Sequence, residues 1–212
     1  MSTWISRALL LGALVLTGCA EGAKLPFAPD LSGISARAAA LTNGAGRKRL
    51  AETALAGKDI MLAAPDGYCI DRRSLKRAKK ASFAVVARCD SLGVEGYYDV
   101  FDLALITITT APFPKDAARP GASDLIRAGA PAKSLDELTS GGVPFVRLAL
   151  GGHQTENVSP EHWRGIFVLN GHLVALGLYA PDGSPALDRD GAYLLSDLAR
   201  LTRRATEKAQ SD

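Results

Sequence analysis

The sequence has few of the residues from which common catalytic and metal-binding motifs are built. It contains only three histidines and three cysteines in 212 residues. It has no Gly-x-Ser-x-Gly elbow, no His-Glu-x-x-His helix and no Cys-x-x-Cys pair. These absences exclude the usual signatures of nucleophile-elbow hydrolases, zinc proteases and dithiol oxidoreductases, and the sequence implies no cofactor.

Charge and hydropathy exclude two further classes. A net charge of +3 is too small to indicate a nucleic-acid-binding protein. The apolar run of residues 8–16 is too short to span a bilayer, and no other run approaches the required length of about 18 residues. The composition, 47% hydrophobic and 22% charged, is typical of a folded globular domain.

The N-terminus has the order of residues expected of a secretion signal. Arg7 and the terminal amine supply positive charge, and the small apolar residues 8–16 follow directly. The next residues, Leu16-Thr17-Gly18-Cys19, resemble the lipobox of bacterial lipoproteins. The alternative is an ordinary signal peptide followed by a chance cysteine.

The lipobox resemblance implies cleavage before Cys19 and acylation of its thiol and new amine with palmitate-like chains. Ala20 follows in place of the aspartate that retains many such lipoproteins in the inner membrane. The resemblance therefore implies anchoring at the periplasmic face of the cell envelope, in the outer membrane rather than the inner. The expected partners are membrane lipid, through the acylated Cys19, and an unidentified envelope protein.

The mature chain has the length of a single domain, since domains usually span about 100–200 residues. Gly22, Pro26 and Pro29 lie in a stretch with few large apolar side chains, which favours a tether. We predict a signal peptide at 1–18, a lipid anchor and tether at 19–45, and one domain at 46–212.

Two cysteines remain once Cys19 is assigned to lipid. An even number of cysteines in an exported protein indicates a disulfide, here between Cys69 and Cys89. Each cysteine ends a predicted extended segment, so the bond requires these two strands to be neighbours.

A basic segment lies between the two cysteines. Asp71 is a candidate cap for a short helix over residues 72–80. This stretch holds six cations: Arg72, Arg73, Lys76, Arg77, Lys79 and Lys80. They could contact anionic lipid headgroups, each contributing about 1 kcal/mol near such a surface. The alternative is a solvated helix face or loop.

The second half of the chain has the clearest local patterns. Asn170-Gly171 between two apolar runs predicts a hairpin with a type I′ turn, in which Leu169 faces His172 and Trp163 faces Leu178. Both faces of this hairpin are apolar, so we expect both to be covered. Ser134-Leu135-Asp136-Glu137 resembles a capping box and predicts a short helix that ends at Gly141-Gly142.

A final helix is predicted from residue 187 or 188 to about 206. Its expected apolar stripe consists of Leu194, Leu198, Leu201 and Ala205. The chain is thus predicted to be α+β, an antiparallel sheet of about five or six strands with a long C-terminal helix packed on it. This order of elements loosely resembles the PsbP-like fold, and the residues around Cys69 resemble small exported bacterial proteins; neither resemblance implies an activity.

Histidine supplies the only candidate catalytic cluster. His153, His162, Glu156 and Glu161 share one predicted loop, where they could form a metal or acid–base site. The alternative is a set of solvated side chains. His172 lies at the hairpin turn, too far from His162 to share a metal ion.

Three functions remain open at this stage. The first is a non-enzymatic binding or accessory module of the envelope. The second is a hydrolase or lyase that acts on cell-wall or exported substrates through the loop of residues 151–162. The third is a small-ligand carrier with a cleft between the sheet and the terminal helix.

Overall fold

The structure is a computed structural model that describes residues 48–95, 103–150 and 157–212. The expected signal peptide, the lipidated Cys19 and the tether at 19–45 lie outside these residues. In chain order the strands are β1 Glu52–Leu55, β2 Ile60–Ala63, β3 Tyr68–Ile70, β4 Lys76–Arg77, β5 Ser82–Arg88, β6 Leu105–Pro112, β7 Lys133–Ser140, β8 Val143–Ala149, β9 Glu161–Leu169 and β10 His172–Tyr179. The helices are α2 Ala122–Gly129 and α3 Arg189–Ser211, and three short 3₁₀ turns are η3 Ala56–Lys58, η4 Asp90–Leu92 and η5 Pro185–Leu187.

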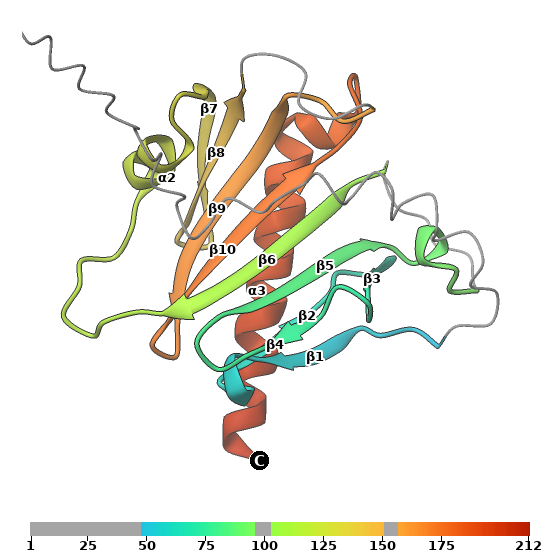
Figure 1. Ribbon diagram of the computed structural model, residues 1–212, viewed down its shortest axis with the longest axis vertical. Helices are drawn as coiled ribbons and strands as arrows, with labels where there is room; N and C mark the ends of the chain where they lie inside the picture. Colours follow the sequence, from blue (N-terminus) through green and yellow to red (C-terminus); the bar gives the residue numbers. More distant parts are fainter. Residues whose placement is uncertain (1–47, 96–102, 151–156) are drawn as a thin grey trace, which may run out of the picture.

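The fold is α+β, as the sequence predicts. Eight strands form one antiparallel sheet in the order β3-β5-β6-β10-β9-β8-β7, with β4 paired to β5. β1 and β2 form a separate two-stranded sheet. The large sheet has more strands than the expected five or six, because β7 and β4 come from segments predicted to be helical. The helix α3 runs behind the sheet in Figure 1 and covers one of its faces.

The β9–β10 hairpin at the centre of the sheet confirms the predicted register. Leu169 pairs with His172 and Trp163 with Leu178. Asn170 and Gly171 have φ values of 47° and 71°, the left-handed conformation that a type I′ turn requires. β10 also pairs with β6 along its whole length, so the hairpin is enclosed between strands on both sides.

The principal core lies between the large sheet, the β1–β2 pair and α3. Its largest fully buried side chains include Trp163, Phe145, Leu195 and Leu198. Burying each such side chain stabilises the fold by roughly 1.5–3 kcal/mol. The Trp163 indole N–H also donates to the carbonyls of Leu187 and Asp188, which fixes the start of α3 against β9.

The apolar stripe of α3 differs from the predicted one. The helix buries Gly191, Ala192, Leu195, Leu198, Ala199, Thr202 and Thr206. Of the four predicted residues only Leu198 is buried, and Leu194, Leu201 and Ala205 lie half-buried beside this line. The difference arises because the last turns pack against β2, where hydroxyl groups are needed: Thr206 accepts from the Met61 N–H and Thr202 from the Ala63 N–H.

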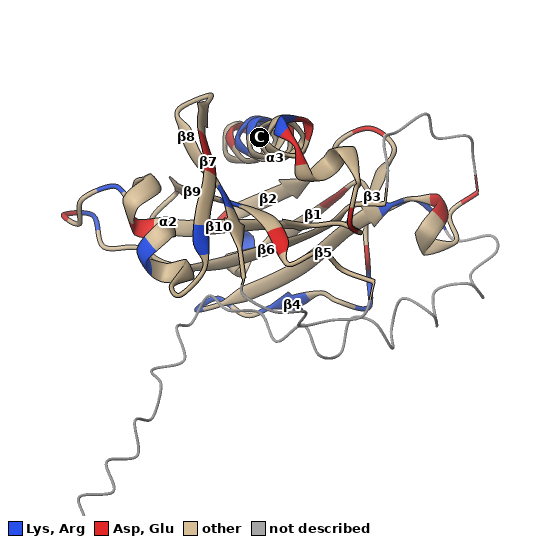
Figure 2. Cartoon of the chain, turned by 90° about the horizontal axis from the view of Figure 1, so that it is seen from above, with Lys and Arg blue, Asp and Glu red and all other residues tan. Residues whose placement is uncertain are grey.

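The opposite face of the sheet is covered in part by α2. Leu125 of this helix packs on Val146, Leu148, Ile166 and Leu173 in a smaller apolar cluster. Figure 2 shows α2 at one end of the sheet, away from α3. The predicted hairpin is thus covered on both faces, by α3 on one and by α2 on the other.

Two predicted helices are wrong. The supposed capping box at Ser134 lies in strand β7, which pairs with β8 from Lys133 to Ser140. Gly141 and Gly142 have φ values of 57° and 70°, so they form a two-residue hairpin turn and do not end a helix. The basic segment is also not a helix: Asp71 accepts from the Arg73 N–H in a turn, and Lys76 and Arg77 then pair with β5 as β4.

The predicted disulfide is present. Cys69 and Cys89 are bonded, with their Cα atoms 4.8 Å apart. β3 pairs with β5, and the Cys89 N–H donates to the Gly67 carbonyl, so the two strands are neighbours as the bond requires. Both cysteines lie in a small buried cluster with Ala87, Leu92 and Val94, on the sheet face that α3 does not cover.

Candidate functional site

Four polar side chains lie together on the sheet face that α3 leaves open. His162 and Arg164 project from β9, Tyr179 from β10 and Thr107 from β6, because alternate residues of paired strands share a face. We call these four residues the Arg164 cluster. Three of them are buried: His162 at 3% exposure, Thr107 at 3% and Tyr179 at 5%.

Gly177 provides the floor of this cluster. A Cβ atom at this position would lie 2.9 Å from the Thr107 hydroxyl, 3.2 Å from the Tyr179 ring and 3.3 Å from an Arg164 guanidinium nitrogen. The three groups therefore converge above a residue without a side chain. Any larger residue would push them apart, so this glycine is required by close packing, not by backbone conformation.

His162 and Tyr179 are stacked on each other. Their rings lie 5.4 Å apart at an angle of 16°, and the Arg164 guanidinium lies 5.4 Å from the Tyr179 ring centre. Such cation–π contacts are worth about 0.5–2 kcal/mol, depending on solvent access. The expected loop position of His162 is thus wrong, because β9 begins at Glu161 and places this ring inside the domain.

Burial keeps His162 neutral. Loss of solvation, with a smaller contribution from the nearby Arg164 charge, lowers the pKa of His162 to about 4. The hydrogen bond at 3.3 Å between Nδ1 and the Pro160 carbonyl opposes this shift. Since a carbonyl can only accept, the neutral ring donates from Nδ1 and its charge is absent at pH 7.

Tyr179 is held protonated for the same reason. Burial raises the pKa of Tyr179, and the positive charge of Arg164 opposes part of this rise. The Tyr179 hydroxyl is buried and lies close to Thr107 and Arg164, and its interactions with both side chains also oppose the rise in its pKa. The hydroxyl is therefore held within the Arg164 cluster.

Arg164 has no carboxylate partner in the part of the chain that the structure describes. None of the ion pairs formed between residues of the three described ranges includes it. Its side chain also lines a cavity of about 100 Å³ between α2 and the sheet. The remaining lining is mostly apolar and includes Leu125, Leu148, Ile166 and Ala175. Asp124 also lines the cavity, but its carboxylate pairs with Arg127 of the same helix.

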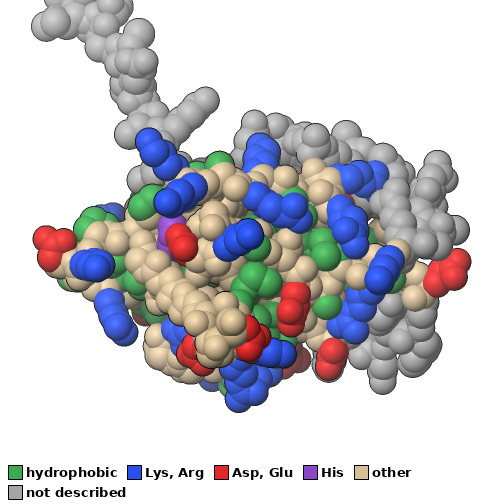
Figure 3. Space-filling model, turned by 90° about the horizontal axis from the view of Figure 1, so that it is seen from below, with side chains coloured by type: hydrophobic (Ala, Val, Ile, Leu, Met, Phe, Trp, Pro, Cys, Tyr) green, Lys and Arg blue, Asp and Glu red, His purple; other side chains and the backbone are tan. Residues whose placement is uncertain are grey.

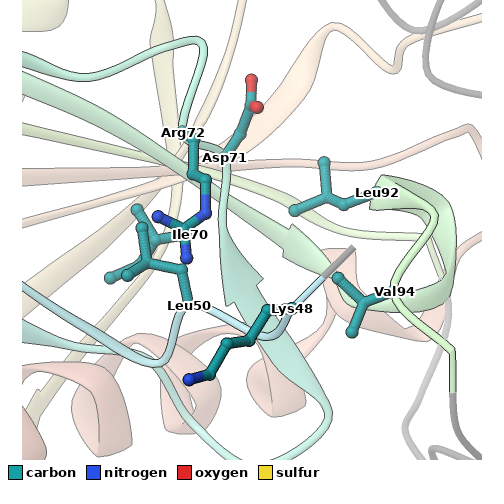
Figure 4. A pocket seen from close by; sticks show the side chains of 7 residues that line it. All are labelled: Lys48, Leu50, Ile70, Asp71, Arg72, Leu92 and Val94. Atoms are coloured by element: carbon teal, nitrogen blue, oxygen red, sulfur yellow. The ribbon is translucent and has the colours of Figure 1, made fainter. Parts of the chain in front are cut away.

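A second hollow is much smaller. It has a volume of about 30 Å³ and is lined by Lys48, Leu50, Ile70, Asp71, Arg72, Leu92 and Val94. In Figure 4 the Arg72 guanidinium points toward Leu50 and Ile70, whereas the Asp71 carboxylate points away. This volume is about that of one water molecule in the liquid, so it is too small for an organic ligand.

The six predicted surface cations are all exposed: Arg72, Arg73, Lys76, Arg77, Lys79 and Lys80. Only Arg73 has a carboxylate partner among the described residues, Asp71 at 3.9 Å. Arg77 donates to the Thr53 hydroxyl of β1. The Lys79 side chain lies against Gly57, which brings it beside η3 and its exposed Lys58. We call the cations of residues 72–80, together with Lys58, the cationic edge.

Figure 3 shows the end of the molecule where α3 ends and where η3 and the β4–β5 turn lie. Lys and Arg side chains are spread across this end, and several acidic side chains lie among them. The cationic edge therefore belongs to a surface of mixed charge that is rich in Lys and Arg.

Only part of the expected histidine–glutamate cluster falls within the described residues. His153 and Glu156 lie outside the described residues. Within those residues, no group of three or more His, Cys, Asp or Glu side chains is placed to hold a metal ion. His162 and His172 lie at opposite ends of the hairpin, as predicted, because His162 pairs with Tyr179 and His172 with Leu169.

The sequence analysis missed the partner of His172. This ring is buried, and its Nε2 lies 3.0 Å from the Asp59 carboxylate, while the Asn170 amide donates to the Asp59 carbonyl. Asp59 follows η3, more than a hundred residues earlier in the chain. No local pattern in the sequence could have indicated this contact, which fastens the β1–β2 turn to the β9–β10 turn.

Comparison with known proteins adds no family. No family model matches the sequence, and no curated protein matches it significantly.

Neither helix of the described ranges combines the length and the hydropathy of a membrane-crossing segment.

Proposed function

We propose that this protein is an exported, lipid-anchored module of the bacterial cell envelope that binds other molecules and does not catalyse a reaction. Cys19 carries the lipid in this proposal, and the folded domain extends into the periplasm from the outer membrane. The supporting observation in the fold is the Cys69–Cys89 disulfide. Disulfides persist in oxidising compartments such as the periplasm and are rare in the cytosol.

The cationic edge supplies the contact between the domain and the membrane. Anchoring at Cys19 leaves 28 residues before Lys48 (47 − 19 = 28). At about 3.5 Å per residue the domain remains within about 100 Å of the bilayer. Exposed cations without carboxylate partners are attracted to anionic headgroups by about 1 kcal/mol each within a Debye length of the surface. We therefore place the cationic edge against the lipid.

Replacement of the anchor tests the location. Cys19→Ser removes the thiol that the acyl chain requires, so the precursor should remain uncleaved and without lipid. Two or three acyl chains hold a protein on a membrane far more firmly than one. Fractionation of cells and mass measurement of the protein should show both changes. A variant that matures and fractionates like the wild type would contradict the proposal.

Amine footprinting tests the orientation. The acylated protein is reconstituted in neutral vesicles and in vesicles with anionic phosphatidylglycerol, and both are treated with an amine-acylating reagent that does not cross membranes. Lys76, Lys79 and Lys80 should react several-fold more slowly in the anionic vesicles, and high salt should abolish the difference. Lys133, an exposed residue of β7, is the internal control. Equal rates in both vesicles would exclude the proposed contact.

A further inference from the structure

The cavity beneath α2 and the Arg164 cluster form one continuous site, because Arg164 belongs to both. Its side chain lines the cavity, and its guanidinium lies 5.4 Å from the ring centre of Tyr179. A cation without a carboxylate partner among the described residues therefore adjoins an apolar hollow. This combination, a mostly apolar cavity with a few convergent polar groups, is typical of small-molecule sites.

We propose that this site binds a small organic acid, whose carboxylate pairs with Arg164 while its hydrocarbon tail fills the cavity beneath α2. The site is separate from the cationic edge, and the proposal does not depend on the lipid anchor. It makes the domain a carrier or sensor of short-chain carboxylates.

The charge of the site selects an anion. Arg164 has no carboxylate partner within the described residues, and the neighbouring His162 is neutral at pH 7. A guanidinium matches the two oxygens of a carboxylate in a bidentate geometry. The Tyr179 and Thr107 hydroxyls lie beside Arg164 and offer further donors to the same oxygens.

The size of the cavity limits the tail. Its volume of about 100 Å³ is smaller than the roughly 150 Å³ of an engineered cavity that accommodates benzene. A tail of about three or four carbons therefore fits, and longer chains must extend past the helix into solvent. The cavity differs from the expected cleft, because it lies beneath α2 and not beneath the terminal helix.

The proposal is tested with the purified full-length protein by NMR titration, using the backbone amide signals of Gly165 and Ile166 as the readout. The probes are acetate, butanoate, pentanoate and octanoate, together with butylamine as a cation of similar shape. Affinity should rise about fourfold for each added methylene up to a tail of four carbons and then level off. Butylamine should leave these signals unchanged. An affinity that does not depend on chain length would overturn the proposal.

Two variants separate the carboxylate contact from the cavity. Arg164→Gln should weaken butanoate binding at least tenfold, because hydrogen bonds to a charged group are lost. Ala128→Leu places a larger side chain in the cavity from an exposed helix position, so it should block binding without affecting folding. Lys133→Gln removes an exposed cation elsewhere and should bind like the wild type. Retention of butanoate affinity in both site variants would overturn the proposal.

Discussion

The two faces of the large sheet are built on different principles. The face beneath α3 is closed: Trp163, Phe145, Leu195 and Leu198 are fully buried there, and the Trp163 indole N–H is hydrogen-bonded. Among the described residues, α2 covers part of the opposite face, which carries the Arg164 cluster and the cavity. Stability thus comes mainly from one face, which leaves the other free to hold polar groups that reduce stability and offer contacts to ligands.

The same strands serve both faces. Trp163 and His162 are adjacent in β9, yet one is bonded in the core and the other is stacked on Tyr179 across the sheet. Alternation along a strand makes this division possible, because successive side chains point to opposite sides. A substitution in β9 should therefore affect stability if its side chain faces α3, and ligand binding if its side chain lies on the face of the Arg164 cluster.

The largest effect is expected from the closed face. Trp163→Ala should reduce the free energy of unfolding by about 3–5 kcal/mol, because it leaves a cavity and removes the donor to the Leu187 and Asp188 carbonyls. Leu105→Ala, at a half-buried position on the open face, should cost about 1 kcal/mol. Urea denaturation measures both. Equal losses of unfolding free energy would show that the two faces do not differ in their contribution to stability.

Removal of the disulfide should show how much of the stability of the open face comes from this covalent bond. Replacing Cys69 and Cys89 together with alanine should cost about 3 kcal/mol on the chain-entropy model, whose mechanism is disputed. Thermal unfolding of the double variant beside the wild type measures this. Digestion of the native protein without reductant should yield one peptide pair joined through these cysteines. Two thiols that alkylate readily in the native protein would refute the pairing.

A smaller effect is expected from acidification. The pKa of His162 is about 4 in the folded protein and near 6.5 when unfolded, so below pH 6.5 the unfolded state binds the additional proton. Stability should therefore fall as the pH decreases from about 6.5 to 4, by about 1 kcal/mol between pH 7 and 5.5. His162→Gln should remove this component of the pH dependence. Denaturation curves at matched pH values would contradict the assignment if the two proteins lost stability equally.

The fold could be predicted where local patterns determine it. Asn170-Gly171 specifies a turn whose geometry fixes the register of both strands, so the hairpin was predicted correctly. The basic segment and β7 were not. Ser134 and Glu137 have the spacing of a capping box, but pairing with β8 determines the conformation of β7. Tertiary pairing overrode a local preference in both segments.

The candidate site could be predicted from the sequence less well than the fold. The polar residues before Trp163 predict a loop at His162, because no local pattern indicates that β9 begins at Glu161. Arg164 and Tyr179 belong to no recognisable motif, because each is an ordinary residue for a strand. They come together only because β9 pairs with β10. Gly177 was the one available signal: a glycine inside an apolar strand often marks a close approach of neighbouring groups.

The hydrogen bonds from β2 to α3 also constrain the order in which the protein folds. The Ala63 and Met61 N–H groups donate to threonines that lie 139 and 145 residues later in the sequence. These two N–H groups of β2 therefore gain their partners only when α3 is in place. Contacts of such long sequence separation slow folding, because closing a long loop costs chain entropy before the contact forms. A chain without α3 would leave both groups without these acceptors, so the β1–β2 pair depends on α3 for its completion.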